Sequence, residues 1–238
     1  MTEAPATPAD ASREMTGSIP NLDGIAARIR AELAVKNAAR DKALGESREL
    51  IRHCSLAIRA IHRAEYAASE PLLAAAWNLV QTLQSDLAPH PDLYSAGYVQ
   101  DALKEYAEAR SVLALVLGQP VPDPEEIHVP SPAYLNGLAE AVGELRRYVL
   151  DSLRRGDDSR LESILRSMDE IYTVLVSMDY PDALTANLRR TTDVTRGIIE
   201  KTRGDLTYAQ QQRSLERSLH AFELRIIGCC GETAGHAN

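Results

Sequence analysis

The chain has 238 residues, of which 45% are hydrophobic and 25% are charged, so it can build the core of one large domain or two small ones. Its formal net charge is −8 and its isoelectric point is about 5.3. This acidic balance argues against a protein that coats nucleic acid over its whole surface, because phosphate binding depends on cationic side chains. It is compatible with a local basic patch.

The cysteine and hydropathy patterns favour a reducing compartment. The three cysteines, Cys54, Cys229 and Cys230, are odd in number and contain no CxxC pair, which predicts neither a disulfide framework nor a zinc site. No apolar run reaches the roughly 18 residues that cross a bilayer, and the N-terminal residues lack the apolar stretch of a signal peptide. We therefore expect a cytoplasmic protein without a membrane partner.

Helical periodicity dominates the chain. The first helix is expected from about Leu22 to His62, because apolar residues there follow a heptad-like seam: Leu44, Ile51, Cys54, Ile58 and Ile61. Prolines in "APHPD" and "GQPVPDPEEIHVPSP" then end helices expected over about 67–87 and 93–117. Further helices are expected over about 131–155 and 159–178, from Asp179 or Asp182 to Arg203, and, after "RGDLT", over about 206–224.

These elements predict an all-α fold, a single-domain bundle of six to seven helices joined by short connections. The domain is expected to cover residues 21–225. Residues 1–20 are rich in Ala, Pro, Thr and Ser and are expected to form a disordered arm. Residues 226–238 are expected to form a flexible tail.

Two pairs of glutamates occur at helical spacing. Glu105 and Glu108 are three residues apart in "QDALKEYAEARSVL", and Glu140 and Glu144 are four apart on the next helix. If these helices pack antiparallel, four carboxylates meet and repel one another unless a cation lies between them. Mg²⁺ or Mn²⁺ suits such oxygen ligands and supports phosphodiester cleavage. The alternative is an ordinary solvated face, since exposed glutamates are common on helices.

The same segments carry a family resemblance. "KEYAEA" (104–109), "YLNGLAEAVGELRR" (134–147) and "DYPDALTANLRRTTDVTRGIIEKTRGDLT" (179–207) resemble the translin family over about residues 25 to 220. The first two are closest to the translin-associated factor X branch. In that branch an E-x-x-E motif, here Glu105 and Glu108, and a G-x-x-D-x-x-x-E motif, here Glu140 and Glu144, form a ribonuclease site. Glu140 stands where the motif has aspartate, so its carboxylate is one methylene farther from the backbone.

The resemblance implies an α-helical protomer that assembles into a hollow homo-oligomer, often an octamer, and binds single-stranded RNA and DNA. It further implies a metal-dependent endoribonuclease in which the four glutamates hold Mg²⁺ or Mn²⁺, and a prokaryotic chain of this kind is expected to self-assemble. A translin-like oligomer that binds single strands without cleaving them is the alternative. A helical assembly with surface glutamates is a third.

Arginines offer candidate phosphate contacts. Arg146 and Arg147 lie just beyond Glu144, and four more form a stripe on the first helix: Arg48, Arg52, Arg59 and Arg63. The stripe is also compatible with a solvated face paired with three neighbouring acids: Glu46, Glu49 and Glu65.

Overall fold

A computed structural model describes the backbone of residues 21–232 and the side chains of residues 21–225. The predicted N-terminal arm, residues 1–20, lies outside this range, as do residues 233–238 of the predicted tail. Residues 226–232, also assigned to that tail, continue the last helix.

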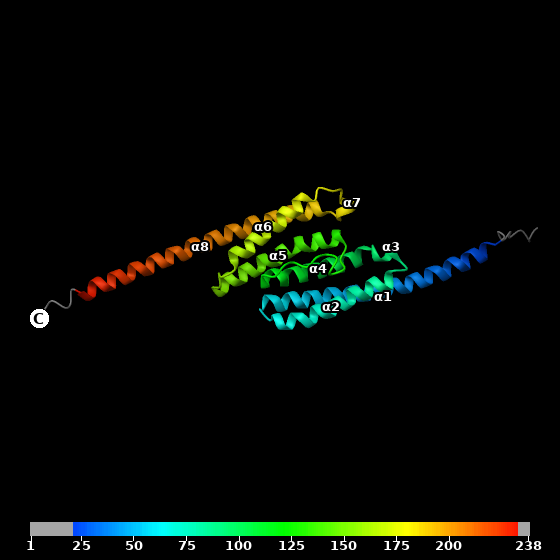
Figure 1. Cartoon of the computed structure of the whole chain (residues 1–238), viewed down its shortest axis with the longest axis horizontal. Helices are drawn as coiled ribbons and strands as arrows, with labels where there is room; N and C mark the ends of the chain where they lie inside the picture. Colours follow the sequence, from blue (N-terminus) through cyan, green and yellow to red (C-terminus); the bar gives the residue numbers. More distant parts are fainter. Residues whose placement is uncertain (1–20, 233–238) are drawn as a thin grey trace, which may run out of the picture. The chain divides into compact units, whose positions relative to one another are not determined.

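The described chain is all-α, as predicted, and contains no strand (Figure 1). Its helices are α1 (Leu22–His62), α2 (Tyr66–Leu87), α3 (Pro91–Tyr94), α4 (Gly97–Leu117), α5 (Ser131–Arg155), α6 (Leu161–Ser177), α7 (Asp182–Thr185) and α8 (Leu188–Glu232). α3 and α7 are single turns of four residues each, so the six longer helices correspond to the main elements expected from the sequence.

Three predicted boundaries differ from the structure. The helix expected from Asp179 or Asp182 to Arg203 is divided into α7 and α8, because Ala186 and Asn187 between them adopt left-handed φ values of 52° and 63°. The helix expected over 93–117 is divided into α3 and α4, because Ala96 adopts an extended conformation and begins α4 as its N-cap. The break expected at "RGDLT" is absent, and α8 continues through Gly204. A glycine inside a helix costs only about 1 kcal/mol relative to alanine, which the rest of a long helix can offset.

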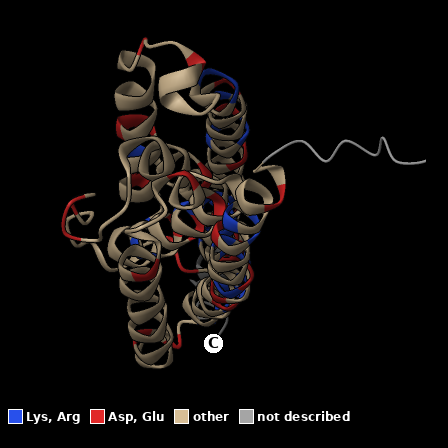
Figure 2. Cartoon of the chain, turned by 90° about the vertical axis from the view of Figure 1, so that its right-hand side faces the viewer, with Lys and Arg blue, Asp and Glu red and all other residues tan. Residues whose placement is uncertain are grey.

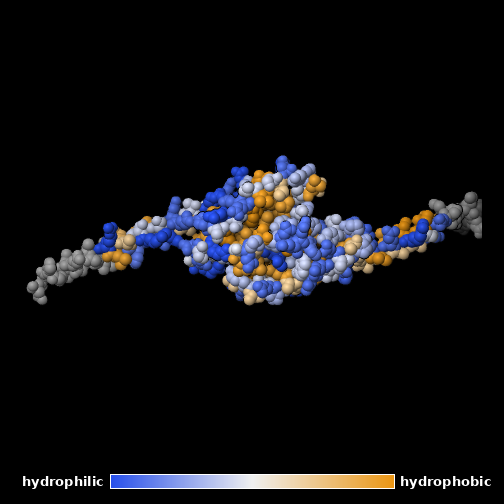
Figure 3. Space-filling view, viewed as in Figure 1, coloured by the Kyte–Doolittle hydropathy of each residue, from blue (hydrophilic) through white to orange (hydrophobic). Residues whose placement is uncertain are grey.

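The chain divides into two compact units, residues 1–42 and 43–238. The described part of the first unit is the N-terminal stretch of α1, which carries exposed apolar side chains (Figure 3): Leu22, Ile25, Ile29, Leu33 and Val35. The second unit contains the rest of α1 and all other helices, and it holds every site discussed below.

Two hydrophobic clusters stabilise the second unit. One joins α1, α2 and α4 around Leu50, Leu83 and Leu103. The other joins α4, α5, α6 and α8 around Leu145 and Met168. Because α4 contributes to both clusters and makes its most extensive contact with α5, the α4–α5 interface lies at the centre of this packing. No helix in the described range is both long enough and apolar enough to span a lipid bilayer.

The C-terminal half of α8 extends beyond the other helices of this unit (Figure 1). The side chains that the structure describes there, up to residue 225, are mostly exposed. Three of them, Leu215, Leu219 and Phe222, are apolar and spaced four and three residues apart. This spacing places them on one side of the helix.

Candidate metal centre

The candidate site lies where α4 and α5 pack together. Gly137 on α5 sits so close to α4 that a Cβ atom there would lie 2.5 Å from the Lys104 carbonyl oxygen and 3.1 Å from the Glu108 amide nitrogen. Small residues next to the acids, such as Ala107 on α4 and Ala141 on α5, are fully buried. Glycine and alanine therefore let the two helix backbones approach closely enough for the glutamate side chains of both helices to meet.

Three of the four predicted acids converge. Carboxylate oxygens of Glu105, Glu108 and Glu140 all lie within 4.8 Å of one another. Glu108 is only 7% exposed, and in the described part of the chain no hydrogen bond or ion pair reaches its carboxylate. A buried carboxylate without a partner is costly, so the arrangement favours either a proton or a cation at this point.

The electrostatics of the cluster follow from burial and mutual repulsion. Burial, reinforced by repulsion from Glu105, Glu140 and Glu144, raises the pKa of Glu108 to about 8. Burial also raises the pKa of Glu105, although Lys104 opposes this effect. Near neutral pH, Glu108 therefore keeps its proton unless a positive charge stabilises the ionised form.

The fourth acid, Glu144, has a different environment. Its Oε2 atom lies 2.5 Å from Nε2 of His62, a nearly buried residue at the end of α1. This hydrogen bond lowers the pKa of Glu144 and outweighs the effect of its partial burial. Arg147 Nη1 lies 3.9 Å from the same carboxylate oxygen. Glu144 is thus held ionised at the edge of the trio and acts on Glu108 through charge.

Lys104 supplies a positive charge that the sequence reasoning missed. Its Nζ atom donates a hydrogen bond to Glu140 Oε1 at 2.8 Å, and this contact raises the pKa of the lysine against the opposing effect of burial. Lys104 lies one helical turn before Glu108, and this spacing is the sequence signal from which a lysine near the acids could have been predicted. The His62 contact joins residues 82 positions apart and left no local signal.

The donor set fits a hard divalent cation. Glu105, Glu108 and Glu140 offer only carboxylate oxygens, which Mg²⁺ and Mn²⁺ prefer, and they lie close enough together to be candidate ligands of one ion. The longer Glu140 side chain still reaches the cluster, so its substitution for aspartate preserves convergence.

The predicted arginines differ in the contacts that they make. Arg52 and Arg63 form ion pairs with neighbouring glutamates, Glu49 and Glu65, whereas Arg48 and Arg59 are exposed and take part in none of the ion pairs of the described chain. Acidic and basic residues are interspersed along the helices (Figure 2).

Of the two arginines beyond Glu144, Arg146 contacts α8, at 2.8 Å from Asp205 and 3.1 Å from Thr202. Arg147 is more exposed and lies near Glu144 and Asp151. A role for any of these arginines in nucleic-acid binding stays a prediction.

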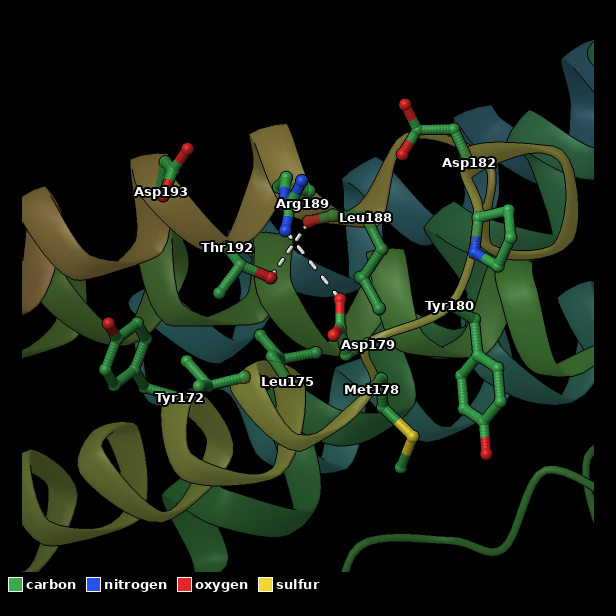
Figure 4. Close-up of a pocket in the computed structure, with 12 residues that line it drawn as sticks. Tyr172, Leu175, Met178, Asp179, Tyr180, Asp182, Leu188, Arg189, Thr192 and Asp193 are labelled. Atoms are coloured by element: carbon green, nitrogen blue, oxygen red, sulfur yellow. Dashed lines mark hydrogen bonds and ion pairs between the residues drawn. The ribbon is translucent and has the colours of Figure 1, made fainter.

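A cavity of about 720 Å³ lies between the end of α6, α7 and the start of α8. Figure 4 shows Leu175 of α6 beside Leu188 and Thr192 of α8, with Met178 pointing away from them and Arg189 turned toward Asp179. The arginine lies 3.7 Å from this aspartate. None of the residues lining this cavity belongs to the carboxylate cluster, so we treat it as separate from the candidate metal centre.

Comparisons with known proteins identify the family and the fold of the chain. A profile of the Translin family matches residues 6–208. An uncharacterized protein of Methanocaldococcus jannaschii is 31% identical over 196 residues, which cover 82% of this chain and 86% of that protein.

Solved structures of similar fold include AfC3PO in complex with duplex RNA, with 34% identity and a TM-score of 0.74 over 78% of this chain and 96% of that chain. The crystal structure of AfC3PO alone gives 34% identity and a TM-score of 0.73, over 78% and 97% of the two chains. Apo-NeC3PO, at 21% identity and a TM-score of 0.69 over 81% and 98%, supports the fold alone. The family profile and the shared fold together show that this chain belongs to the translin family.

Proposed function

We propose that the protein is a metal-dependent endoribonuclease that cleaves single-stranded RNA inside a self-assembled oligomer, and that it belongs to the translin-associated factor X branch of its family. The observation that carries this proposal is the convergence of Glu105, Glu108 and Glu140 within 4.8 Å, with Glu108 buried and without a partner. The similarity to AfC3PO, a protein solved with duplex RNA, supports RNA as the ligand.

In this proposal Glu105, Glu108 and Glu140 hold Mg²⁺ or Mn²⁺, and Glu144 completes the acidic site. A bound divalent ion supplies charge to a phosphate under attack and activates water. Water adds to phosphorus and one of the four carboxylates accepts its proton, while the bond to the ribose oxygen breaks and that oxygen takes up a proton from solvent. Lys104 holds Glu140 in place and provides a positive charge that favours binding of the phosphodiester.

Self-assembly is supported by the exposed apolar residues of α8. Leu215, Leu219 and Phe222 are each more than half exposed, and burying such a row against another copy is favourable by about 25 cal/mol per Å² of apolar surface. We propose a homo-oligomer, with an octamer as the expected state. Light scattering of a Leu219→Glu, Phe222→Glu double variant should give a smaller assembly than the unmodified protein; an unchanged mass would exclude this row from the interface.

A second candidate is a translin-like oligomer that binds single-stranded RNA or DNA without cleaving it. It is favoured by the ion pair of Glu140 with Lys104 and the hydrogen bond of Glu144 with His62, because both carboxylates already have a partner in the protein and depend less on a cation.

One assay distinguishes the two candidate functions. A labelled single-stranded RNA is incubated with the protein in Mg²⁺, in Mn²⁺ and in EDTA, beside a duplex of the same sequence. The proposal expects cleavage of the single strand that requires metal and is lost in Glu108→Gln, while Glu170→Gln, a change at an exposed acid on α6, cleaves normally. Binding without cleavage would favour the second candidate, and cleavage that persists in EDTA would contradict the proposed metal site.

A further inference from the structure

A second cavity, of about 610 Å³, adjoins the carboxylate cluster. It lies between α3, α4, α5 and α7, and we call it the side cavity. Lys104 and Glu140 line it and also belong to the metal centre. Any group that fills the side cavity therefore sits next to the position where the scissile phosphate is proposed to bind. Its volume is within the range of sites for small organic molecules.

One of the residues that line the side cavity is aromatic. Tyr94 lines the cavity, packs against the α1–α2–α4 core cluster and is about half-buried. Its carbonyl oxygen accepts a hydrogen bond from Gln100 Nε2 at 2.8 Å, which ties α3 to α4. Pro130 and Pro132 add apolar surface to the lining. An aromatic ring beside apolar side chains is the kind of surface on which nucleobases stack.

The opposite rim is formed by α7 and the turn that follows it. Ala186 and Asn187 in this turn have φ values of 52° and 63°, a conformation that costs free energy in residues with a side chain. Asn136 holds the turn by donating from Nδ2 to the Thr185 carbonyl oxygen at 3.0 Å, and its Oδ1 accepts a hydrogen bond from Thr191 at 2.9 Å. The rim is therefore formed before any ligand binds.

Two other polar residues of the side cavity can form hydrogen bonds with a ligand. The polar atoms of Asn136 are used by the protein, but Gln100 uses only its amide nitrogen in the hydrogen bonds of the described chain. Asp101, one residue further along α4, is exposed and lines the same space. A carboxylate and an amide oxygen accept hydrogen bonds from the N–H groups on the edge of a nucleobase.

We propose that the side cavity binds one nucleobase of the RNA strand, the base adjacent to the phosphate held at the carboxylate cluster. This inference rests on the proposed function and names a subsite of it. Tyr94 provides the stacking surface, Gln100 and Asp101 contact the base edge, and Lys104 lies between base and phosphate. A preformed subsite of this kind positions the phosphodiester before cleavage.

The test uses RNA oligonucleotides in which a single abasic ribose is moved through the sequence, cleaved by the full-length protein. The unmodified protein should lose about 5- to 100-fold in kcat/KM when the abasic position falls next to the cleaved bond, as expected for one lost stacking contact. The variant Ala183→Trp, which fills the side cavity from its exposed rim, should cleave intact RNA more slowly and show no further loss with the abasic strand. Ser177→Trp, at an exposed position outside the cavity, is the matched control and should keep the full abasic effect.

A binding measurement separates this inference from the nuclease proposal. Adenosine 5′-monophosphate is titrated by calorimetry in the presence of EDTA, so that cleavage plays no part. Binding that is retained in Ser177→Trp and lost in Ala183→Trp supports the side cavity even if the protein cleaves nothing. Cleavage that is equally sensitive to an abasic ribose at every position, or an abasic effect that persists in Ala183→Trp, overturns the base subsite and leaves the nuclease intact. Thermal melting of each variant checks that the fold is preserved.

Discussion

His62 Nε2 lies 2.5 Å from Glu144 Oε2 and thereby connects the end of α1 to the acidic face of α5. The histidine side chain is only 4% exposed, whereas that of the glutamate is 27% exposed. The buried His62 therefore holds one oxygen of the Glu144 carboxylate from the side of the protein interior.

Removing this support is expected to weaken metal binding. His62→Ala should raise the Mg²⁺ concentration needed for half-maximal cleavage about 10- to 100-fold, the usual cost of losing a group that orients a metal ligand. His62→Gln, which can still donate a hydrogen bond to Glu144, should recover part of that loss. The measurement is the cleavage rate as a function of Mg²⁺ concentration. If both variants lose stability but keep the Mg²⁺ requirement of the unmodified protein, His62 acts only in packing.

Glu108→Gln should stabilise the protein in EDTA, and the effect should grow with pH. The pKa of Glu108 is about 8 in the folded protein, against an ordinary value of 4.5. Below pH 4.5 Glu108 is protonated in both the folded and the unfolded chain, so its raised pKa does not affect the free energy of unfolding there. Between pH 4.5 and 8 the unfolded chain ionises first, and the free energy of unfolding falls.

Since glutamine does not ionise, the stability gained by Glu108→Gln should increase over this window and become constant above about pH 8, with an upper limit of about 4–5 kcal/mol. Each kcal/mol corresponds to about 2–4 °C in Tm for a protein of this size. Thermal melts from pH 5 to 9 at one protein concentration provide the measurement. A Tm difference independent of pH would mean that Glu108 titrates normally.

Gly137→Ala should disturb both the fold and the site. The added Cβ would lie 2.5 Å from a backbone oxygen of α4, so the two helices must separate, at a cost of about 1–3 kcal/mol. Because Glu140 follows on the same helix, the metal requirement should rise as well.

Gly143→Ala on α5 is the matched control, because the nearest atom to its added Cβ is 4.0 Å away. Replacing a helical glycine without a clash should stabilise the protein by up to about 1 kcal/mol. Chemical denaturation of both variants compares them directly. Equal effects at the two positions would show that close approach at Gly137 is not required.

The arginine stripe on α1 should affect how strongly the binding of a single strand depends on salt concentration. If it binds phosphates, Arg48→Gln and Arg59→Gln should each reduce the slope of log K against log salt concentration by about 0.7, the value for one contact with a single strand. Arg52→Gln and Arg63→Gln should change it less, because these arginines are already paired with Glu49 and Glu65. Fluorescence anisotropy with a labelled single strand at several salt concentrations measures the slope. Slopes unchanged in all four variants would exclude the stripe from binding.

Local sequence signals were sufficient for much of the fold. α1 and α5 begin and end close to the predicted residues, because apolar periodicity, the proline in the first turn of α5 and Gly156 at its end (φ 75°) are local signals. The same reasoning was wrong at Gly204, where a glycine followed by an aspartate suggested a break. Packing of α8 against α5 and α6 outweighs that weak preference.

The candidate site could be predicted only in part for a similar reason. The spacing of Glu105 and Glu108, together with the family resemblance, indicated the acids, but spacing does not report what lies opposite them. Lys104 was next to the motif and was still overlooked, because its partner Glu140 is on another helix. Pairings of this kind depend on how helices pack, which a single sequence does not reveal.

The continuity of α8 has a structural consequence. The helix is 45 residues long, or roughly 65 Å at 1.5 Å per residue. Near one end, Thr191 is bonded to the asparagine that shapes the side cavity, and toward the other lies the exposed row around Leu219. Because the helix is continuous, both of these regions are joined by one unbroken run of backbone hydrogen bonds. In the proposed assembly, a neighbouring copy docked near Leu219 and a nucleobase in the side cavity would therefore contact the same continuous helix.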